Sequence, residues 1–180
     1  TYIQCMHWSG SRLFDLECQG KNFLKEAESW AVTTSQLYNK TNKTTQCTND
    51  MILGGPSLWN TVYPLSGWWK QYFNLPPHQG VTIQMTIYPV DSWSNNDHFS
   101  IQVDSLSQDY WILNQATNPS AISNLCGPTV PDIPPVTVYR TVAHTSTRLI
   151  LYVFGWLSSP SNIASFGLRD IVMTFFNSSI

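Results

Sequence analysis

Two runs of alternating apolar and polar residues, joined by a polar corner, constrain the fold of this chain more than any other feature. Every second residue is apolar from Val81 to Ile87, and again from Phe99 to Val103. A strand turns successive side chains to opposite faces, so each run predicts a β-strand with one buried face. The corner between the runs contains Asp91 and Trp93, and we expect these two residues to brace two sheets.

The same period predicts further strands in the second half of the chain. Residues 136–142 alternate again, and Ile171, Met173 and Phe175 share one face of a last strand. The run 149–157 is apolar on both faces, as expected for a central strand buried between two layers. About eight strands and no long helix, separated by loops rich in Pro, Gly, Asn and Ser, predict an all-β fold, a β-sandwich of jelly-roll type.

The first residues are predicted to form a short N-terminal extension of this sandwich. Residues 14–18 alternate as a short strand would, and 22–30 could form one or two helical turns. We therefore divide the chain into an appendage, 1–27, and a β-sandwich domain, 28–180. An appendage of this kind could donate a strand to a neighbouring subunit, because an added strand supplies backbone hydrogen bonds to an open sheet edge.

Low charge excludes two classes of partner. Charged residues make up 11% of the 180 residues, against about a quarter in ordinary soluble proteins, and the net charge is -2. The sequence has no basic run, so nucleic acid and anionic membrane surfaces have no electrostatic footprint to bind. The longest apolar run, 149–157, is too short to cross a bilayer, so we predict no membrane insertion.

Glycosylation signals and cysteines together indicate a secreted protein. Asn39, Asn42 and Asn177 each begin an Asn-x-Ser/Thr acceptor motif. Three acceptors with four cysteines argue for the secretory route, so we expect an extracellular location. The chain starts at Thr1 without an initiator Met or a leader sequence, so we expect a processed mature chain whose signal peptide, if there was one, has been removed.

The cysteines are expected to form disulfides in that oxidising environment. Four cysteines allow three pairings, and spacing alone does not choose among them. We favour Cys5 with Cys18, which flank a Ser9-Gly10-Ser11 turn, and Cys47 with Cys126, which would close a long loop. Reduced thiols and a zinc site are the less favoured readings, since no Cys-x-x-Cys spacing is present.

A series of short motifs is spaced along the chain. The motifs are Gly54-Gly55, Leu75-Pro76-Pro77-His78, Val90-Asp91-Ser92-Trp93, Cys126-Gly127, His144-Thr145-Ser146 and Ser165-Phe166-Gly167-Leu168-Arg169-Asp170-Ile171. Their order and spacing resemble a galactose-binding-like β-sandwich domain of ciliate secreted and cell-surface proteins. The resemblance covers about residues 28–176 and implies an extracellular interaction or structural module without catalysis. One departure is that Ser94-Asn95-Asn96 follow the corner where the family usually has another acid; the next carboxylate is Asp97.

The corner allows a binding role and a structural role. Asp91 and Asp97 are weak candidates for a Ca²⁺ site, because hard cations take several oxygen ligands from a turn. We favour a structural role, in which Asp91 fixes the turn and forms an ion pair with Arg169, while Asp170 points to the opposite face. Trp93 is expected in the core rather than against a sugar.

Catalysis is not predicted, and no cofactor is expected apart from the weak Ca²⁺ candidate. The sequence lacks a Gly-x-Ser-x-Gly nucleophile motif, and its only glutamates lie within the first 28 residues, so paired glycosidase carboxylates are not evident. His78 and His144 precede strands at similar positions and could pair or hold a metal. A structural hydrogen-bonding role is favoured for both.

Tryptophans before the first alternating run are the best candidates for a contact surface. Trp59, Trp68 and Trp69 could contact a sugar or another subunit, and adjacent Trp68 and Trp69 must face opposite sides of a strand. The main hypothesis is a glycosylated extracellular structural module whose copies associate into a surface coat, hair or fibre. The alternative is a lectin-like carbohydrate-binding module, which requires an open aromatic surface with polar groups beside it.

Overall fold

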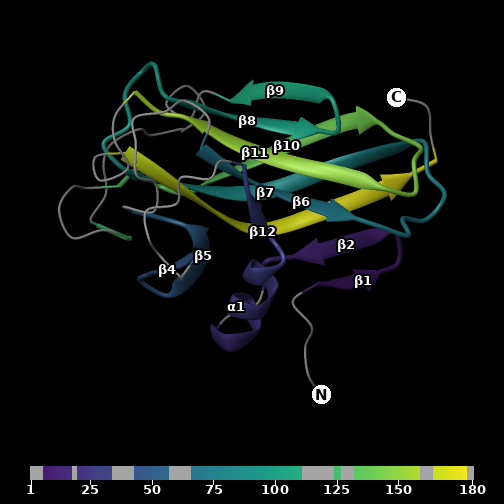
Figure 1. The fold of residues 1–180 in the computed structure, drawn as a ribbon, viewed down its shortest axis with the longest axis horizontal. Helices are drawn as coiled ribbons and strands as arrows, with labels where there is room; N and C mark the ends of the chain where they lie inside the picture. The colour runs from purple at the N-terminus through teal and green to yellow at the C-terminus, as the bar shows by residue number, and fades with distance from the viewer. Residues whose placement is uncertain are drawn as a thin grey trace.

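The computed structural model is a β-sandwich of two antiparallel sheets (Figure 1). It describes residues 6–17, 20–33, 43–56, 66–110, 124–126, 132–158 and 164–177. The predicted all-β sandwich is therefore confirmed. Within these residues, no helix is long and apolar enough to span a membrane.

The seven-stranded sheet is built around the last strand, β12. It contains β1 (His7–Ser9), β2 (Arg12–Asp15), β4 (Thr44–Cys47), β5 (Asp50–Gly54), β7 (Gly80–Asp91), β10 (Val136–Ala143) and β12 (Ala164–Phe176). One edge of β12 pairs with β7, and the other pairs with β2 and β5. β10 pairs with β7 along its whole length.

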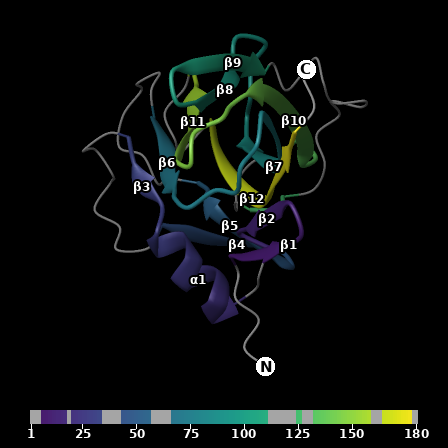
Figure 2. The same cartoon turned by 90° about the vertical axis from the view of Figure 1, so that its right-hand side faces the viewer.

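The five-stranded sheet faces it and runs in the order β3, β6, β11, β8, β9. Its strands are β3 (Ala31–Val32), β6 (Ser66–Tyr72), β8 (His98–Val103), β9 (Leu106–Tyr110) and β11 (Leu149–Trp156). The single described helix, α1 (Gly20–Glu28), lies at the side of the sandwich between β3 and the hairpin of β1 and β2 (Figure 2).

The alternating runs bury the residues that their period indicates. Val81, Ile83, Met85 and Ile87 of β7 are fully buried between the sheets, as are Phe99 and Ile101 of β8. The run 149–157 behaves differently from the prediction. Leu149, Leu151 and Val153 are buried, but the intervening side chains are only half-buried on the outer face of the sheet. β11 is central within its sheet, yet among the described residues no further layer of strands covers its outer side.

The segment predicted as an appendage packs on its own domain. β2 pairs with β12 of the same chain, and Leu16, Phe23 and Ala27 belong to the common core. The predicted helical turns are present as α1. The proposed boundary between residues 27 and 28 thus falls inside one core, and donation of a strand to a neighbouring copy stays a prediction.

Candidate functional site

The outer face of the five-stranded sheet carries a row of aromatic rings. Trp69 of β6 lies directly beside Tyr152 of β11, with ring centroids 6.1 Å apart. The Tyr152 ring stacks on Phe154 at 5.7 Å, with the two planes inclined by 9°. All three side chains are half-buried, so part of each ring remains open to solvent. We call these residues, together with Trp156 and His98, the aromatic face.

A glycine makes room for one of these rings. Gly67 is the register partner of Phe154, and a Cβ placed on Gly67 would lie 2.3 Å from the Val153 carbonyl oxygen. The same Cβ would stand 3.1 Å from Cδ1 of Phe154. The Phe154 ring therefore lies close over the glycine backbone, which lets the sheet present the ring flat beside Tyr152.

A second stacked pair extends the row along β11. Trp156 and His98 are register partners on β11 and β8, with ring centroids 5.8 Å apart and planes inclined by 6°. Because side chains two residues apart share a strand face, Tyr152, Phe154 and Trp156 form one line. The line is long enough to contact several units of a polymer.

Polar side chains border the rings on the β8 and β9 side. Gln102 is the register partner of Tyr152, and its amide donates a hydrogen bond to the Asp104 carbonyl at 2.6 Å. Ser100 lies beside Phe154 and donates its hydroxyl hydrogen bond to the exposed Asp109. These groups place amide, hydroxyl and carboxylate functions next to flat apolar rings.

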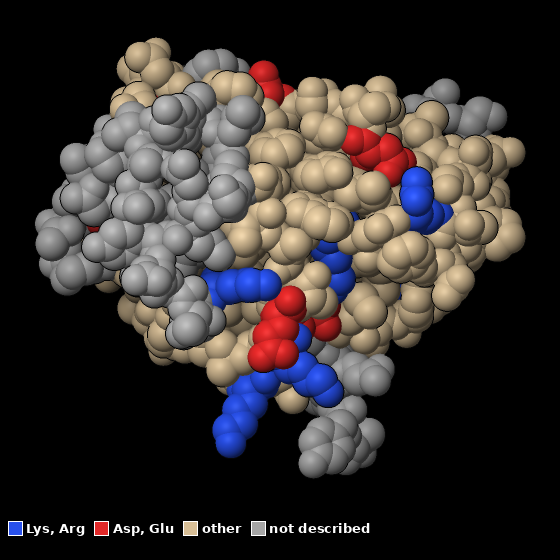
Figure 3. Space-filling model, in the orientation of Figure 1, with Lys and Arg blue, Asp and Glu red and all other residues tan. Residues whose placement is uncertain are grey.

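This arrangement suits a ligand with both apolar and hydroxyl surfaces. An aromatic ring presents a negative face, which attracts the weakly positive C–H groups on one side of a sugar ring. Hydroxyl groups at the sugar's rim need donors and acceptors beside the platform. Charged side chains are few on the molecular face in Figure 3 and gather over α1. Among the described residues, no group of three or more His, Cys, Asp or Glu side chains could hold a metal ion.

The three predicted tryptophans have different outcomes. Trp68 is fully buried in the core, whereas Trp69 faces outward, as adjacent positions in a strand require. Trp59 lies outside the described residues. Sequence analysis missed Tyr152, Phe154 and Trp156. Their signal was present, because aromatic residues occupy every second position of a run that is otherwise aliphatic or glycine.

Trp93 is a core residue, as predicted. It is 8% exposed, and its indole N–H donates to the Ser165 carbonyl of β12 at 2.8 Å. Stacking of a sugar on Trp93 is therefore not available. Trp93 fastens the corner after β7 to the start of the last strand.

Asp132, rather than Asp91, is the acid that accepts backbone hydrogen bonds at this corner. Its Oδ1 accepts from the Asp91 N–H at 2.7 Å, and its Oδ2 accepts from the N–H groups of Leu125 and Cys126 at 2.6 and 2.9 Å. Asp91 has a positive φ of 63°, and its Oδ1 is buried without a hydrogen-bond partner. Burial and the neighbouring Asp132 raise the pKa of Asp91.

Asp97 holds the far side of the corner. Its Oδ2 accepts from the Ser94 N–H at 2.6 Å, and its Oδ1 accepts from the N–H and hydroxyl of Ser158 at 2.6 and 2.8 Å. Both oxygens are occupied by protein donors, which gives this carboxylate a bracing role. Calcium binding by Asp91 and Asp97 stays a prediction.

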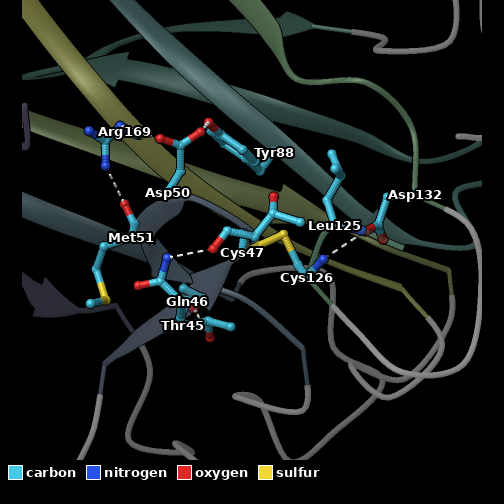
Figure 4. Close-up of a disulfide and its surroundings, with 12 residues drawn as sticks. Thr45, Gln46, Cys47, Asp50, Met51, Tyr88, Leu125, Cys126, Asp132 and Arg169 are labelled. Carbon is cyan, nitrogen blue, oxygen red and sulfur yellow. Dashed lines mark hydrogen bonds and ion pairs between the residues drawn. A yellow bond between two sulfur atoms is a disulfide. The ribbon is translucent and has the colours of Figure 1, made fainter. Parts of the chain in front are cut away.

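The predicted ion pair between Asp91 and Arg169 is wrong. Both residues are described, and no hydrogen bond or ion pair joins them. The Arg169 guanidinium instead donates to the Met51 carbonyl at 2.8 Å (Figure 4) and to the Glu17 carbonyl at 3.2 Å. It ties the last strand to β5 and to the segment before α1, far from the corner.

Asp170 also departs from its predicted orientation. The register of β12 against β7 shifts between Arg169 and Val172, and Asp170 has a positive φ of 51°. This bulge breaks the alternation, so Asp170 Oδ1 lies 3.1 Å from Arg169 Nε rather than on the opposite face. Asp50 lies 3.9 Å from the same nitrogen and accepts a hydrogen bond from Tyr88 at 2.8 Å.

His78 and His144 pair at one end of the sandwich. His78 Nε2 and His144 Nδ1 are 2.7 Å apart, which confirms the predicted pairing. Their other ring nitrogens hydrogen-bond to the Pro76 carbonyl at 2.6 Å and to Asp104 Oδ2 at 3.1 Å. Every ring nitrogen contacts a protein group, so the structural role is favoured over metal ligation.

A disulfide joins Cys47 of β4 to Cys126, as predicted (Figure 4). Because Cys126 also donates to Asp132, the bridge connects β4 to the corner after β7. Cys5, Cys18, Asn39 and Asn42 lie outside the described residues. Asn177 is exposed just after β12, where an attached glycan would reach solvent.

Comparison with known proteins gives a fold likeness without a family. No family model matches the chain, and no curated protein matches it. The resemblance to a ciliate domain family therefore stays a prediction. One similar solved structure is the CBM22-1 xylan-binding domain of Paenibacillus barcinonensis Xyn10C, at 12% identity and a TM-score of 0.47, covering 84% of this chain and 88% of that one.

Two further solved structures extend this comparison. The C-terminal CBM6 of a Zobellia galactanivorans laminarinase has 11% identity and a TM-score of 0.41, covering 81% and 97% of the two chains. The K2 adhesin domain of Lys-gingipain has 14% identity and a TM-score of 0.41, covering 82% and 91%. The similar structures thus include carbohydrate-binding modules, but at these identities and TM-scores the likeness says nothing about what this chain binds.

Proposed function

We propose that the chain is an extracellular carbohydrate-binding module without catalytic activity, and that the aromatic face is its binding surface. The observation that carries this proposal is the row of partly exposed rings formed by Trp69, Tyr152 and Phe154. Rings of this kind would normally be buried, since apolar surface left in water costs about 25 cal/mol per Å². A sugar polymer lying along β11 would cover them.

The polar side chains beside the rings would orient a bound sugar. Gln102, Ser100 and Asp109 lie on the β8 and β9 side of the rings and offer both donors and acceptors to sugar hydroxyls. N-linked glycans at Asn39, Asn42 and Asn177 are part of this proposal, since a secreted protein can be glycosylated. None of these three asparagines belongs to the aromatic face.

The test is binding to a broad glycan array, followed by calorimetric titration of each polysaccharide that binds. The variant Tyr152→Ala removes the middle ring of the row, and we expect it to weaken binding about tenfold. The matched control is Tyr139→Ala, which removes an exposed tyrosine from β10 on the other sheet and should leave the affinity unchanged. No binding to any glycan on the array, or an equal loss of affinity in both variants, would count against the proposal.

Self-association into a coat, hair or fibre is the second candidate, and a different surface favours it. The strip of the seven-stranded sheet's outer face formed by β7, β10 and β12 carries the uncharged side chains of Thr82, Gln84, Thr86, Thr137, Tyr139, Thr141, Val172 and Thr174. The exposed Arg12 of β2 is the register partner of Thr174 at the edge of this strip. The uncharged strip itself imposes no charge repulsion between copies. Sedimentation velocity across a concentration series tests this candidate, and Thr141→Lys should reduce any assembly that uses the face.

A further inference from the structure

A cluster of ionisable side chains is buried where α1 closes the sandwich. Lys70 of β6 points inward, and its Nζ lies 3.0 Å from Oδ2 of Asp15 on β2. The same Nζ contacts Oε1 of Glu26 on α1. Tyr72 donates its hydroxyl hydrogen bond to Asp15 Oδ2 at 2.7 Å. Lys70 is 6% exposed and Asp15 only 1%, so the amine and this carboxyl group are held in contact away from solvent.

Aromatic rings surround the amine. The Lys70 Nζ lies 5.3 Å from the centroid of the Tyr72 ring and 5.9 Å from that of Trp30. Trp30 and Phe23 are fully buried, which makes the surroundings apolar. Such an environment excludes water, and water would otherwise compete with any reaction between the amine and a carboxyl group.

As an ion pair, the cluster is poorly balanced. One ammonium faces two carboxyl groups, and Asp15 Oδ1 is buried without a hydrogen-bond partner. Buried charges are costly unless they are matched and hydrogen-bonded, and replacing such a pair by neutral groups is often stabilising. A neutral amide link between Lys70 and Asp15 would remove both ionisable groups of this pair from the apolar interior.

The two carboxyl groups have different proton affinities. Burial raises the pKa of Asp15 to about 7, an effect that Lys70 opposes and Glu26 reinforces. Burial alone would raise the pKa of Glu26, but its interactions with Asp15 and Lys70 outweigh burial and lower it. When the pKa values of two neighbouring carboxyl groups are shifted in opposite directions, the group with the higher pKa holds a proton and the other accepts one. Here Asp15 has the higher pKa and Glu26 the lower. Burial and Asp15 hold the pKa of Tyr72 well above its ordinary value, so Tyr72 remains a hydrogen-bond donor.

We propose that Lys70 and Asp15 join in an intramolecular amide bond, with Glu26 as the general base. Glu26 takes one proton from the Lys70 ammonium, and the neutral amine attacks Cγ of protonated Asp15. Tyr72 stabilises the negative charge that develops on Oδ2. The Cγ–Oδ1 bond breaks, and Oδ1 leaves as water with its own proton and one from the amine. The proton on Glu26 then passes to solvent, and no oxidant or cofactor is consumed.

The reaction requires little motion, because the fold already holds the groups in contact. Their strands belong to opposite sheets, so the bond would tie β2 of the seven-stranded sheet to β6 of the five-stranded sheet. It would fix the N-terminal hairpin and α1 to the sandwich covalently. This inference is independent of carbohydrate binding, since none of its residues belongs to the aromatic face.

Intact mass spectrometry tests the proposal directly. The full chain is produced in a bacterial periplasm, where disulfides form, and is then reduced and denatured before measurement. We expect a mass lower than the sequence mass by one water. Trypsin should fail to cut after Lys70 and should release a branched peptide that joins the Asp15 and Lys70 segments. The full sequence mass in a protein whose circular dichroism shows it to be folded would overturn the proposal.

Three variants separate the chemistry from simple packing. Glu26→Gln keeps the side-chain size but removes the base, so the mass deficit should disappear. Asp15→Asn supplies an amide as the electrophile, so the same link should form with loss of one ammonia instead of one water. Glu28→Gln changes an exposed acid on the same helix and should keep the deficit of one water. A one-water deficit that persists in folded Glu26→Gln, or its loss in folded Glu28→Gln, each judged against the variant's own sequence mass, would contradict the assigned role of Glu26.

Discussion

The two outer faces of the sandwich differ in what their strands turn toward solvent. β6 and β11 turn out Trp69, Tyr152 and Phe154, whereas β7 and β10 turn out mainly threonine. Threonine on a solvated strand is explained by strand propensity alone. Tyrosine, phenylalanine and tryptophan also favour strands, but three partly exposed rings in a row leave contiguous apolar surface in water, from which folding gains nothing. The aromatic face is therefore the side on which we propose that a ligand binds.

Removing the disulfide should have the largest effect on stability and should show that the two faces are independent. Replacing Cys47 and Cys126 by serine opens a loop with a sequence separation of 79 residues. We expect the free energy of unfolding to fall by about 4 to 5 kcal/mol, as measured by denaturant titration. The bridge lies at the seven-stranded sheet, so carbohydrate affinity should not change while the protein remains folded.

Calorimetric titration at low temperature checks this second part. The circular dichroism of the variant at the same temperature serves as the control for folding. A large loss of affinity in a folded variant would mean that the aromatic face depends on the opposite sheet. The two faces could then not be treated as independent.

Removing two rings of the aromatic face tests whether this face, and not the outer face of the seven-stranded sheet, binds the ligand. We expect Trp69→Ala combined with Tyr152→Ala to weaken polysaccharide binding about a hundredfold, since each aromatic contact is expected to contribute about 1.4 kcal/mol, or a factor of about ten. The matched control is Thr82→Ala combined with Tyr139→Ala on the seven-stranded sheet. Equal affinities for the two double variants would remove the functional distinction between the faces.

Gly67→Ala should disturb both stability and binding. The new Cβ would lie 2.3 Å from the Val153 carbonyl oxygen, so β6 and β11 must move apart and the Phe154 ring must shift. We expect a loss of about 1 to 3 kcal/mol in the free energy of unfolding, measured by urea titration, and weaker sugar binding. Ala143→Val, at an exposed position of β10, should change stability by less than about 0.5 kcal/mol. A Gly67→Ala protein as stable as the wild type would show that the ring does not depend on the glycine.

Local patterns predicted the strands and their buried sides well. Val81 to Ile87 follow a period of two because one side meets the core and the other meets water, and the structure buries the residues indicated. The same reasoning failed for β11, where both sides are apolar and the period disappears. Hydrophobicity alone could not separate Tyr152 and Phe154, which face outward, from Leu151 and Val153, which face the core.

The partners of Arg169 and Asp91 could not be predicted from the sequence. Arg169 was expected to meet Asp91, but a bulge in β12 and the approach of β5 give it other partners. The true acceptor at the corner, Asp132, is 41 positions away from Asp91 and lies in no alternating run. No local signal marks either feature, because bulges and loop positions depend on the packing of the whole sandwich.

The smallest expected effect lies on the threonine side of the comparison. Thr82 and Thr141 are register partners on β7 and β10, and their hydroxyl oxygens are 2.9 Å apart. Thr82→Val keeps the side-chain shape and removes the hydrogen bond, and we expect a loss of about 0.5 kcal/mol in urea titration with unchanged sugar binding. Valine retains strand propensity, so the face should tolerate it. A loss of about 2 kcal/mol or more, or a change in affinity, would mean that this face contributes more than solvated strand surface, and that ring composition alone does not identify the binding side.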